Sequence, residues 1–191
     1  MQRVRYNRIS MILHWLMALG IIGMITLGLL LEDIPSRWQA SAYQFHKALG
    51  ITILFLSFFR LFWRLTHRVP ALPAGMKRWQ RLLAKSTHAL LYTLMIAMPL
   101  SGWLFISTSI KNYPTTWFGV FEIPKLPVFQ GEIRKAAHGF FGEAHELLAY
   151  GAIALICLHV IAALYHHFKL KDDVLTSMLP CCGCKKKSIE A

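Results

Sequence analysis

Acidic side chains are scarce in this sequence, where nine Asp and Glu stand against 21 Lys and Arg among 191 residues. Charged residues of both signs make up only 16% of the chain, hydrophobic residues make up 55%, and the mean hydropathy is +0.45. A soluble domain of this length carries more charge. The shortage of charge therefore argues against a soluble globular protein.

Motifs for several kinds of redox and disulfide chemistry are also missing. The chain holds no flavin, iron–sulfur or dinucleotide-binding motif. Its four cysteines do not form a disulfide framework, because Cys157 lies in an apolar run and Cys181, Cys182 and Cys184 crowd the C-terminal tail. We interpret residues 180–191 as a cytoplasmic Cys/Lys tail without a cofactor, attached to one domain over residues 1–179. A metal site on the three cysteines stays open as the alternative, although a fourth ligand is missing.

Long apolar runs are what the chain does have. A span of about 20 apolar residues crosses a bilayer core, and four such runs occur: Ile9–Leu31, Ala42–Phe62, Thr87–Ser107 and His145–Phe168. Basic residues precede the first run, as in a signal peptide, but that run is too long and no small-residue cleavage site follows. We therefore expect four transmembrane helices.

The basic residues are distributed unevenly around these spans. With the N-terminus inside, the inside segments hold 15 of the 21 Lys and Arg: Arg3, Arg5, Arg8, Arg60, Arg64, Arg68, Lys77, Arg78, Arg81, Lys85, Lys169, Lys171 and Lys185 to Lys187. This positive-inside pattern places both termini in the cytoplasm of a multi-pass protein. It indicates a membrane partner rather than nucleic acid.

Short connections favour antiparallel neighbouring helices, so we predict an all-α, integral membrane four-helix bundle. The third connection, residues 108–135, is the longest and is rich in Pro, Gly and aromatic residues. We expect it to pack as an ordered cap over the outer end of the bundle.

Nine histidines occur in the chain, and an ionisable side chain inside a membrane needs a partner or a function. Counted at ~1.5 Å per helical residue, His14 lies about 9 Å and His159 about 15 Å from the cytoplasmic side. His46 and His145 open the second and fourth spans at the outer side. Each level thus pairs histidines from two different helices.

The spacing along the helices supports this pairing. His145 and His159 are 14 residues apart, about four turns, so they share a face roughly 21 Å apart along the axis. Facing imidazoles at two levels are what two stacked haems need, one axial nitrogen on each side of each porphyrin. No C-x-x-C-H segment for covalent attachment occurs, so the haems are predicted to be of the b type.

Arg60 repeats the 14-residue interval from His46 and is a candidate partner for a haem propionate. Gly50, one turn after His46, would give a flat macrocycle room to approach, although close packing of small residues between helices explains such a glycine equally well. Three alternatives stay open for the histidines: hydrogen bonding between helices, zinc and a proton relay. Zinc would want clustered ligands, and a relay would want carboxylates, of which none lies deep in a span.

These residues resemble the bacterial cytochrome b561 family of four-helix, di-haem membrane cytochromes. The motifs that carry the resemblance are H-W at His14, H-K-x-x-G at His46 and L-H-x-x-x-A-L-x-H-H-F-x-x-K-D-D from Leu158. The resemblance covers roughly residues 5–179. It implies that His14 and His159 hold an inner haem and that His46 and His145 hold an outer one.

The resemblance also implies electron exchange with the quinone pool of the bacterial inner membrane. One type of member oxidises superoxide at the periplasmic surface and reduces ubiquinone, which makes superoxide the first donor to consider. Other relatives are haem-bearing anchor or relay subunits of larger dehydrogenases, or accept electrons from periplasmic redox proteins. Six acids balance the six basic residues predicted to lie outside, so the charge count gives no positive funnel for superoxide.

A quinone needs hydrogen-bond partners for its oxygens and protons when it is reduced. We place this site at the cytoplasmic rim, on His88 and His166, with Arg78, Trp79 and Arg81 just before the third span. His167 could replace His166. Simple anchoring of Trp and Arg at the membrane boundary is the alternative reading of these residues.

Overall fold

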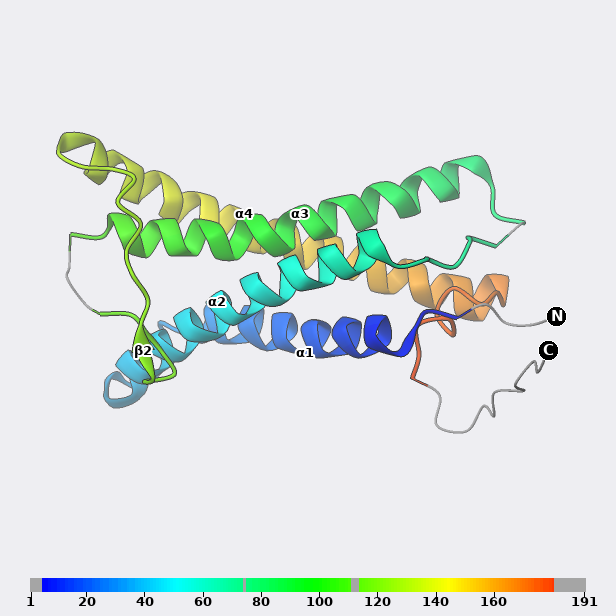
Figure 1. Cartoon of the computed structure of the whole chain (residues 1–191), viewed down its shortest axis with the longest axis horizontal. Coiled ribbons are helices and arrows are strands. Elements are labelled where there is room, and N and C mark those ends of the chain that lie inside the picture. Colours follow the sequence, from blue (N-terminus) through cyan, green and yellow to red (C-terminus); the bar gives the residue numbers. More distant parts are fainter. Residues whose placement is uncertain (1–4, 74, 111–113, 181–191) are drawn as a thin grey trace.

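The computed structural model describes residues 5–73, 75–110 and 114–180 and is built around four long helices. These are α1 (Arg8–Leu30), α2 (Ser36–Thr66), α3 (Arg78–Thr108) and α4 (Glu132–Tyr165). They run side by side along the molecule (Figure 1), and each is long and apolar enough to cross a membrane. The predicted four-helix membrane bundle is confirmed.

Three of the helices extend beyond the apolar runs that predicted them. Helix α2 begins at Ser36 rather than Ala42, α3 at Arg78 rather than Thr87, and α4 at Glu132 rather than His145. Hydropathy detects only the part of a helix that lies in the hydrocarbon core. The polar turns beyond that core still satisfy their own backbone hydrogen bonds, so the helices continue past it.

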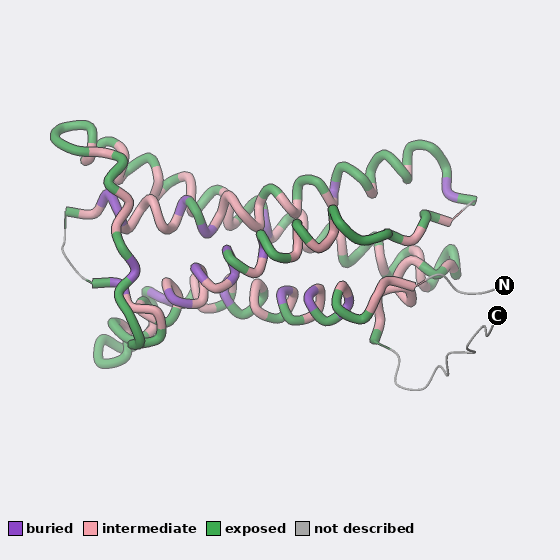
Figure 2. The backbone as a smooth tube through the Cα atoms, viewed as in Figure 1, coloured by how far each residue is buried: buried purple, intermediate pink, exposed green. Residues whose placement is uncertain are grey.

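The outside of the bundle is apolar. Large side chains such as Leu19, Phe55 and Leu147 are 68%, 65% and 72% exposed, and only short stretches of the helices and of the connections are buried (Figure 2). Soluble proteins rarely expose such large apolar patches to water, whereas lipid chains can cover an apolar surface without cost. The described surface is that of a protein with lipid around its helices.

Helices that follow one another in the chain pack together, α1 on α2, α2 on α3 and α3 on α4. A proline inside α3, Pro99, lacks the N–H that would bond the carbonyl of Met95. The hydroxyl of Ser57 in α2, a fully buried residue, lies 3.1 Å from that carbonyl. The proline is thus accommodated by a contact from the neighbouring helix.

The third connection forms an ordered cap wherever the structure describes it. Strands β1 (Thr116–Trp117) and β2 (Phe121–Glu122) form an antiparallel hairpin that crosses one end of the bundle (Figure 1). The indole of Trp117 donates to the hydroxyl of Thr52 at 3.0 Å, and that of Trp103 donates to the Pro124 carbonyl at 3.0 Å. This end is called the outer end, and its short hairpin is an exception to the all-helical prediction.

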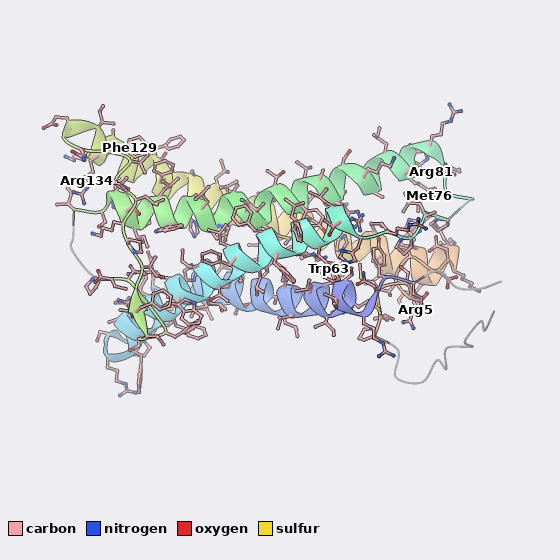
Figure 3. All side chains as sticks on the ribbon, in the orientation of Figure 1. Arg5, Trp63, Met76, Arg81, Phe129 and Arg134 are labelled. Carbon is pink, nitrogen blue, oxygen red and sulfur yellow. The ribbon has the colours of Figure 1, made fainter. Side chains whose placement is uncertain are left out.

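The opposite, inner end holds both ends of the described chain. Helix α4 continues into a π-helical turn, η1 (His166–Leu170), and residues 171–180, called the C-terminal strap, return to α1. The N–H of Tyr6 donates to Ser177, the indole of Trp15 donates to Met178 at 2.9 Å, and Arg5 donates to Leu179. Figure 3 shows Arg5, Trp63 and Arg81 at this end and Phe129 and Arg134 at the other.

The cytoplasmic location of the inner end remains a prediction. Cys181, Cys182 and Cys184 lie outside the described residues, as does most of the predicted tail over 180–191. The division into a domain over 1–179 and a tail therefore also remains a prediction.

Candidate functional site

Two pairs of histidines face each other inside the bundle, as the sequence predicts. The ring centroids of His46 and His145 are 6.3 Å apart, with ring planes at 78°. Those of His14 and His159 are 6.2 Å apart, at 69°. Two metal–nitrogen bonds of about 2 Å and the half-widths of two imidazoles add up to about 6 Å between centroids. Each pair therefore has the separation that one iron between two axial imidazoles requires.

Helix α4 packs closely on one neighbour. Among the described helices, α3 is the only long one on which α4 packs extensively. The histidine pairs instead join α4 to α1 and to α2. This arrangement fits a porphyrin between the rings better than a zinc ion, and no group of three or more metal-binding side chains gathers within the described residues.

His145, one member of the outer pair, forms hydrogen bonds with residues of α3. Nδ1 of His145 lies 3.0 Å from the carbonyl oxygen of Met98 and 3.0 Å from the hydroxyl oxygen of Ser101. Because a carbonyl can only accept, Nδ1 of His145 carries the proton and donates it. Nε2 is then the unprotonated nitrogen that can bind iron, which is the arrangement of metal-bound histidines generally.

Two glycines make the room for the outer rings. A Cβ at position 102 would lie 2.9 Å from Cε1 of His145, and one at position 28 would lie 3.3 Å from Cε1 of His46. At Gly50 a Cβ would meet only the methyl of Met24, at an ordinary 3.5 Å. Sequence reasoning missed Gly102, although the P-L-S-G run inside an apolar span was the available signal.

The ring of His46 has an unsatisfied nitrogen. Its Nδ1 is buried and has no hydrogen-bond partner among the described residues. Buried polar atoms in proteins nearly always have a partner. This nitrogen lies toward α1, since a Cβ at position 28 would be 3.9 Å from it, so it is a different nitrogen from the Nε2 that would bind iron.

At the inner pair, Nη2 of Arg60 lies 2.8 Å from Nδ1 of His14. The predicted level of Arg60, beside the inner histidines, is confirmed. The ring of His14 also contacts Trp15, the residue that bonds the C-terminal strap, with centroids 5.3 Å apart. The inner pair is thus connected by direct contacts to both α2 and the strap.

His88 lies deeper than the sequence-based placement at the rim. Its ring centroid is 5.5 Å from that of His159, and its Nδ1 lies 2.7 Å from the carbonyl of Ala84 one turn earlier. The placement of His88 at the rim did not predict this contact with His159, because distance along the chain does not show which face of α3 turns toward α4.

The other predicted rim residues lie in separate elements at the inner end. His166 begins the π-helical turn, and its Nδ1 donates to Oδ2 of Asp172 at 2.5 Å. Arg78, Trp79 and Arg81 lie in the first turn of α3 with exposed side chains. Among the contacts described for Arg78 and Trp79, none reaches His88 or His166, and exposed Trp and Arg at a helix start suit interfacial anchoring.

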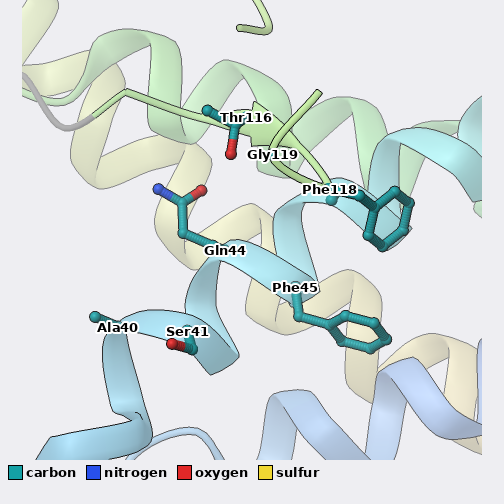
Figure 4. Close-up of a pocket in the computed structure, with 8 residues that line it drawn as sticks. Ala40, Ser41, Gln44, Phe45, Thr116, Phe118 and Gly119 are labelled. Atoms are coloured by element: carbon teal, nitrogen blue, oxygen red, sulfur yellow. The ribbon is translucent and has the colours of Figure 1, made fainter. Parts of the chain in front are cut away.

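A separate hollow of about 350 Å³ lies at the outer end between α2 and the hairpin. Phe45 and Gln44 line it from α2, and Thr116 and Phe118 line it from the hairpin (Figure 4). Gln44 and His46 are two residues apart and so point to nearly opposite sides of α2. This hollow is therefore not part of the histidine site.

Comparison with known proteins identifies the arrangement. The prokaryotic cytochrome b561 family matches residues 5–181. The chain belongs to this family. Cytochrome b561 homolog 2 of Escherichia coli (strain K12) is 35% identical over 177 residues, which cover 92% of this chain and 91% of the relative.

Two further relatives are similar over comparable lengths. Cytochrome b561 homolog 1 of the same strain is 28% identical, covering 92% of this chain and 97% of the relative. Probable superoxide oxidase CybB of Yersinia pestis is 27% identical, covering 92% and 96%. As a cytochrome b561, the chain is a multi-pass membrane protein that binds haem b and transfers electrons.

Proposed function

We propose that the chain holds two b haems, one between His14 and His159 and one between His46 and His145. It passes electrons between a periplasmic donor and the quinone pool of the bacterial inner membrane. The observation that carries this proposal is the pair of cross-helix imidazole separations, 6.2 and 6.3 Å. Both match a single iron between two rings.

Haem iron supplies one-electron chemistry when it is bound. The protein contributes the ring nitrogens, their orientation and the exclusion of water. Met98 and Ser101 fix the proton of His145 on Nδ1, which leaves Nε2 for the iron. Arg60 is the proposed partner of a haem propionate, and Gly50 is proposed to leave space along the flat face of the macrocycle.

Superoxide is the first donor to test, because one relative bears the name probable superoxide oxidase. Two superoxide ions would each give up one electron and leave as two molecules of O₂, and one quinone would take up these two electrons together with two protons from water. Oxidation and reduction then balance. The chain is thus proposed to be an oxidoreductase that joins the two half-reactions across the membrane.

We place quinone reduction at the inner end, near His88 and His166. His88 contacts the proposed ligand His159, and His166 holds a hydrogen bond to Asp172 beside the strap. An imidazole bonded to a carboxylate is a suitable proton donor for a reduced quinone.

A haem-bearing relay subunit for a larger dehydrogenase or a periplasmic protein is the second candidate. The tip of the hairpin favours it, because Val120 and Phe121 are 72% and 55% exposed at the outer end. An exposed apolar tip suits contact with another protein.

Purified protein mixed with superoxide and a ubiquinone analogue separates the two candidates. The first predicts rapid haem reduction by superoxide, followed by reoxidation that requires quinone. Inertness toward superoxide, with a normal haem spectrum, would instead support the relay function.

A further inference from the structure

Two arginines stand one turn apart on α2 at the inner end, between the inner histidine pair and the start of α1. Arg60 and Arg64 line a narrow hollow together with Tyr6, Trp63, Tyr92 and Met178 of the strap. Both arginine side chains are partly buried. The hollow therefore places two permanent positive charges, partly buried, beside aromatic side chains.

Neither guanidinium has a carboxylate partner within the described part of the chain. Arg60 bonds His14 and lies over the ring of Tyr92, with 5.9 Å from Cζ to the centroid. Arg64 donates to the hydroxyl of Tyr6 at 3.2 Å and lies over the ring of Tyr6, with 5.7 Å from Cζ to the centroid. Partly buried cations are normally paired with anions, so these contacts leave the charge of both groups uncompensated.

The hydrogen bond between Arg60 and His14 also has a consequence for metal binding. An arginine can only donate, so Nδ1 of His14 is the acceptor and the proton of the neutral ring sits on Nε2. Nε2 can bind iron only if that proton moves to Nδ1. An anion that draws Arg60 away would leave Nδ1 free to carry it.

We infer that Arg60 and Arg64 together bind the two propionate carboxylates of the inner haem, with the Tyr6 hydroxyl as a further donor. This rests on the proposed haem between His14 and His159. The two arginines are four residues apart, about 6 Å along the helix axis, so both can reach toward two carboxylates that stand on adjacent edges of one ring. An anionic lipid headgroup is the competing occupant, since basic pockets between helices at this depth also bind such lipids.

The test uses full-length chain made without haem and reconstituted with haem b or with its dimethyl ester, which lacks both carboxylates. Arg64→Gln is compared with Arg68→Gln, an exposed arginine beyond the end of α2. With haem b, Arg64→Gln should weaken inner-haem binding roughly tenfold or more and lower the midpoint potential of that haem alone. With the ester, Arg64→Gln and wild type should bind equally, and Arg68→Gln should match wild type throughout.

Other outcomes overturn the inference. If Arg64→Gln lowers the affinity for haem b and for the ester equally, Arg64 has a structural role. If it lowers neither affinity, Arg64 does not bind a propionate. An effect that appears only in nanodiscs with anionic lipid, and is absent in neutral lipid, would assign the site to lipid. The proposed haem between His14 and His159 is tested separately. It would be wrong if the His159→Ala variant kept both haems, whatever the result for Arg64→Gln.

Discussion

The carbonyl oxygen of Met98 lies 3.0 Å from Nδ1 of His145, across the contact between α3 and α4. Three residues within about one turn of α3 thereby serve one ring: Met98 accepts its proton, Ser101 adds a second oxygen and Gly102 leaves the space. Helix α3 carries neither member of the outer pair, yet it fixes the orientation of one of them.

Gly102→Ala should release the outer haem selectively. The added Cβ would lie 2.9 Å from Cε1 of His145. This distance is too short, so either the α3 backbone or the His145 ring would have to move. Disturbing the support of a metal-bound histidine typically weakens binding 10–100-fold, and we expect a loss of about this size for one haem. Redox titration of the optical spectrum measures each haem separately. Gly23→Ala is the control, because nothing lies within 4 Å of a Cβ there; equal behaviour of the two variants would contradict the close packing of Gly102.

Single histidine replacements should remove the haems pair by pair. His46→Ala and His145→Ala are expected to perturb one spectral component, and His14→Ala and His159→Ala the other, because the rings meet in these pairs. A pyridine haemochrome assay should find close to two haems in the wild type and about one in each variant. His67→Ala, at an exposed position, is the matched control. If His46→Ala and His14→Ala affected the same component, the two levels would be assigned wrongly.

The ring planes make a spectroscopic prediction. Within each pair the imidazoles are far from parallel, at 69° and 78°, so they donate into different iron d orbitals and leave those orbitals nearly equal in energy. Electron paramagnetic resonance of the oxidised protein should therefore show strongly anisotropic low-spin signals from both haems. Rhombic signals of the kind given by parallel imidazoles would mean that the rings turn when haem binds.

Trp15→Phe should loosen the C-terminal strap. The indole bond to the Met178 carbonyl would be lost at a cost of about 1 kcal/mol, while the ring contact with His14 could persist. Faster hydrogen exchange over residues 171–180 is the expected result. Trp38→Phe is the control, since Trp38 is 60% exposed near the start of α2. Unchanged exchange in Trp15→Phe would show that Tyr6 and Arg5 hold the strap without it.

The sequence predicted the four spans and both histidine pairs, because hydropathy and helical spacing are properties of single helices. It failed where the answer depended on how helices turn toward one another. His88 was counted as shallow, although its ring contacts His159, because the rotation of α3 cannot be read from distance along the chain. Arg64 bonds Tyr6, and Trp15 bonds the strap. Both contacts join residues from separate elements, and the periodicity of a single helix cannot predict them.

Both histidine pairs take one imidazole from α4, the last helix to leave the ribosome. A growing chain that has only α1, α2 and α3 therefore holds one ring of each pair. Under the proposed function, neither haem can have both of its axial ligands until α4 has been made. The strap that bonds Trp15 follows α4 in the chain, so it can dock on α1 only after both pairs are complete.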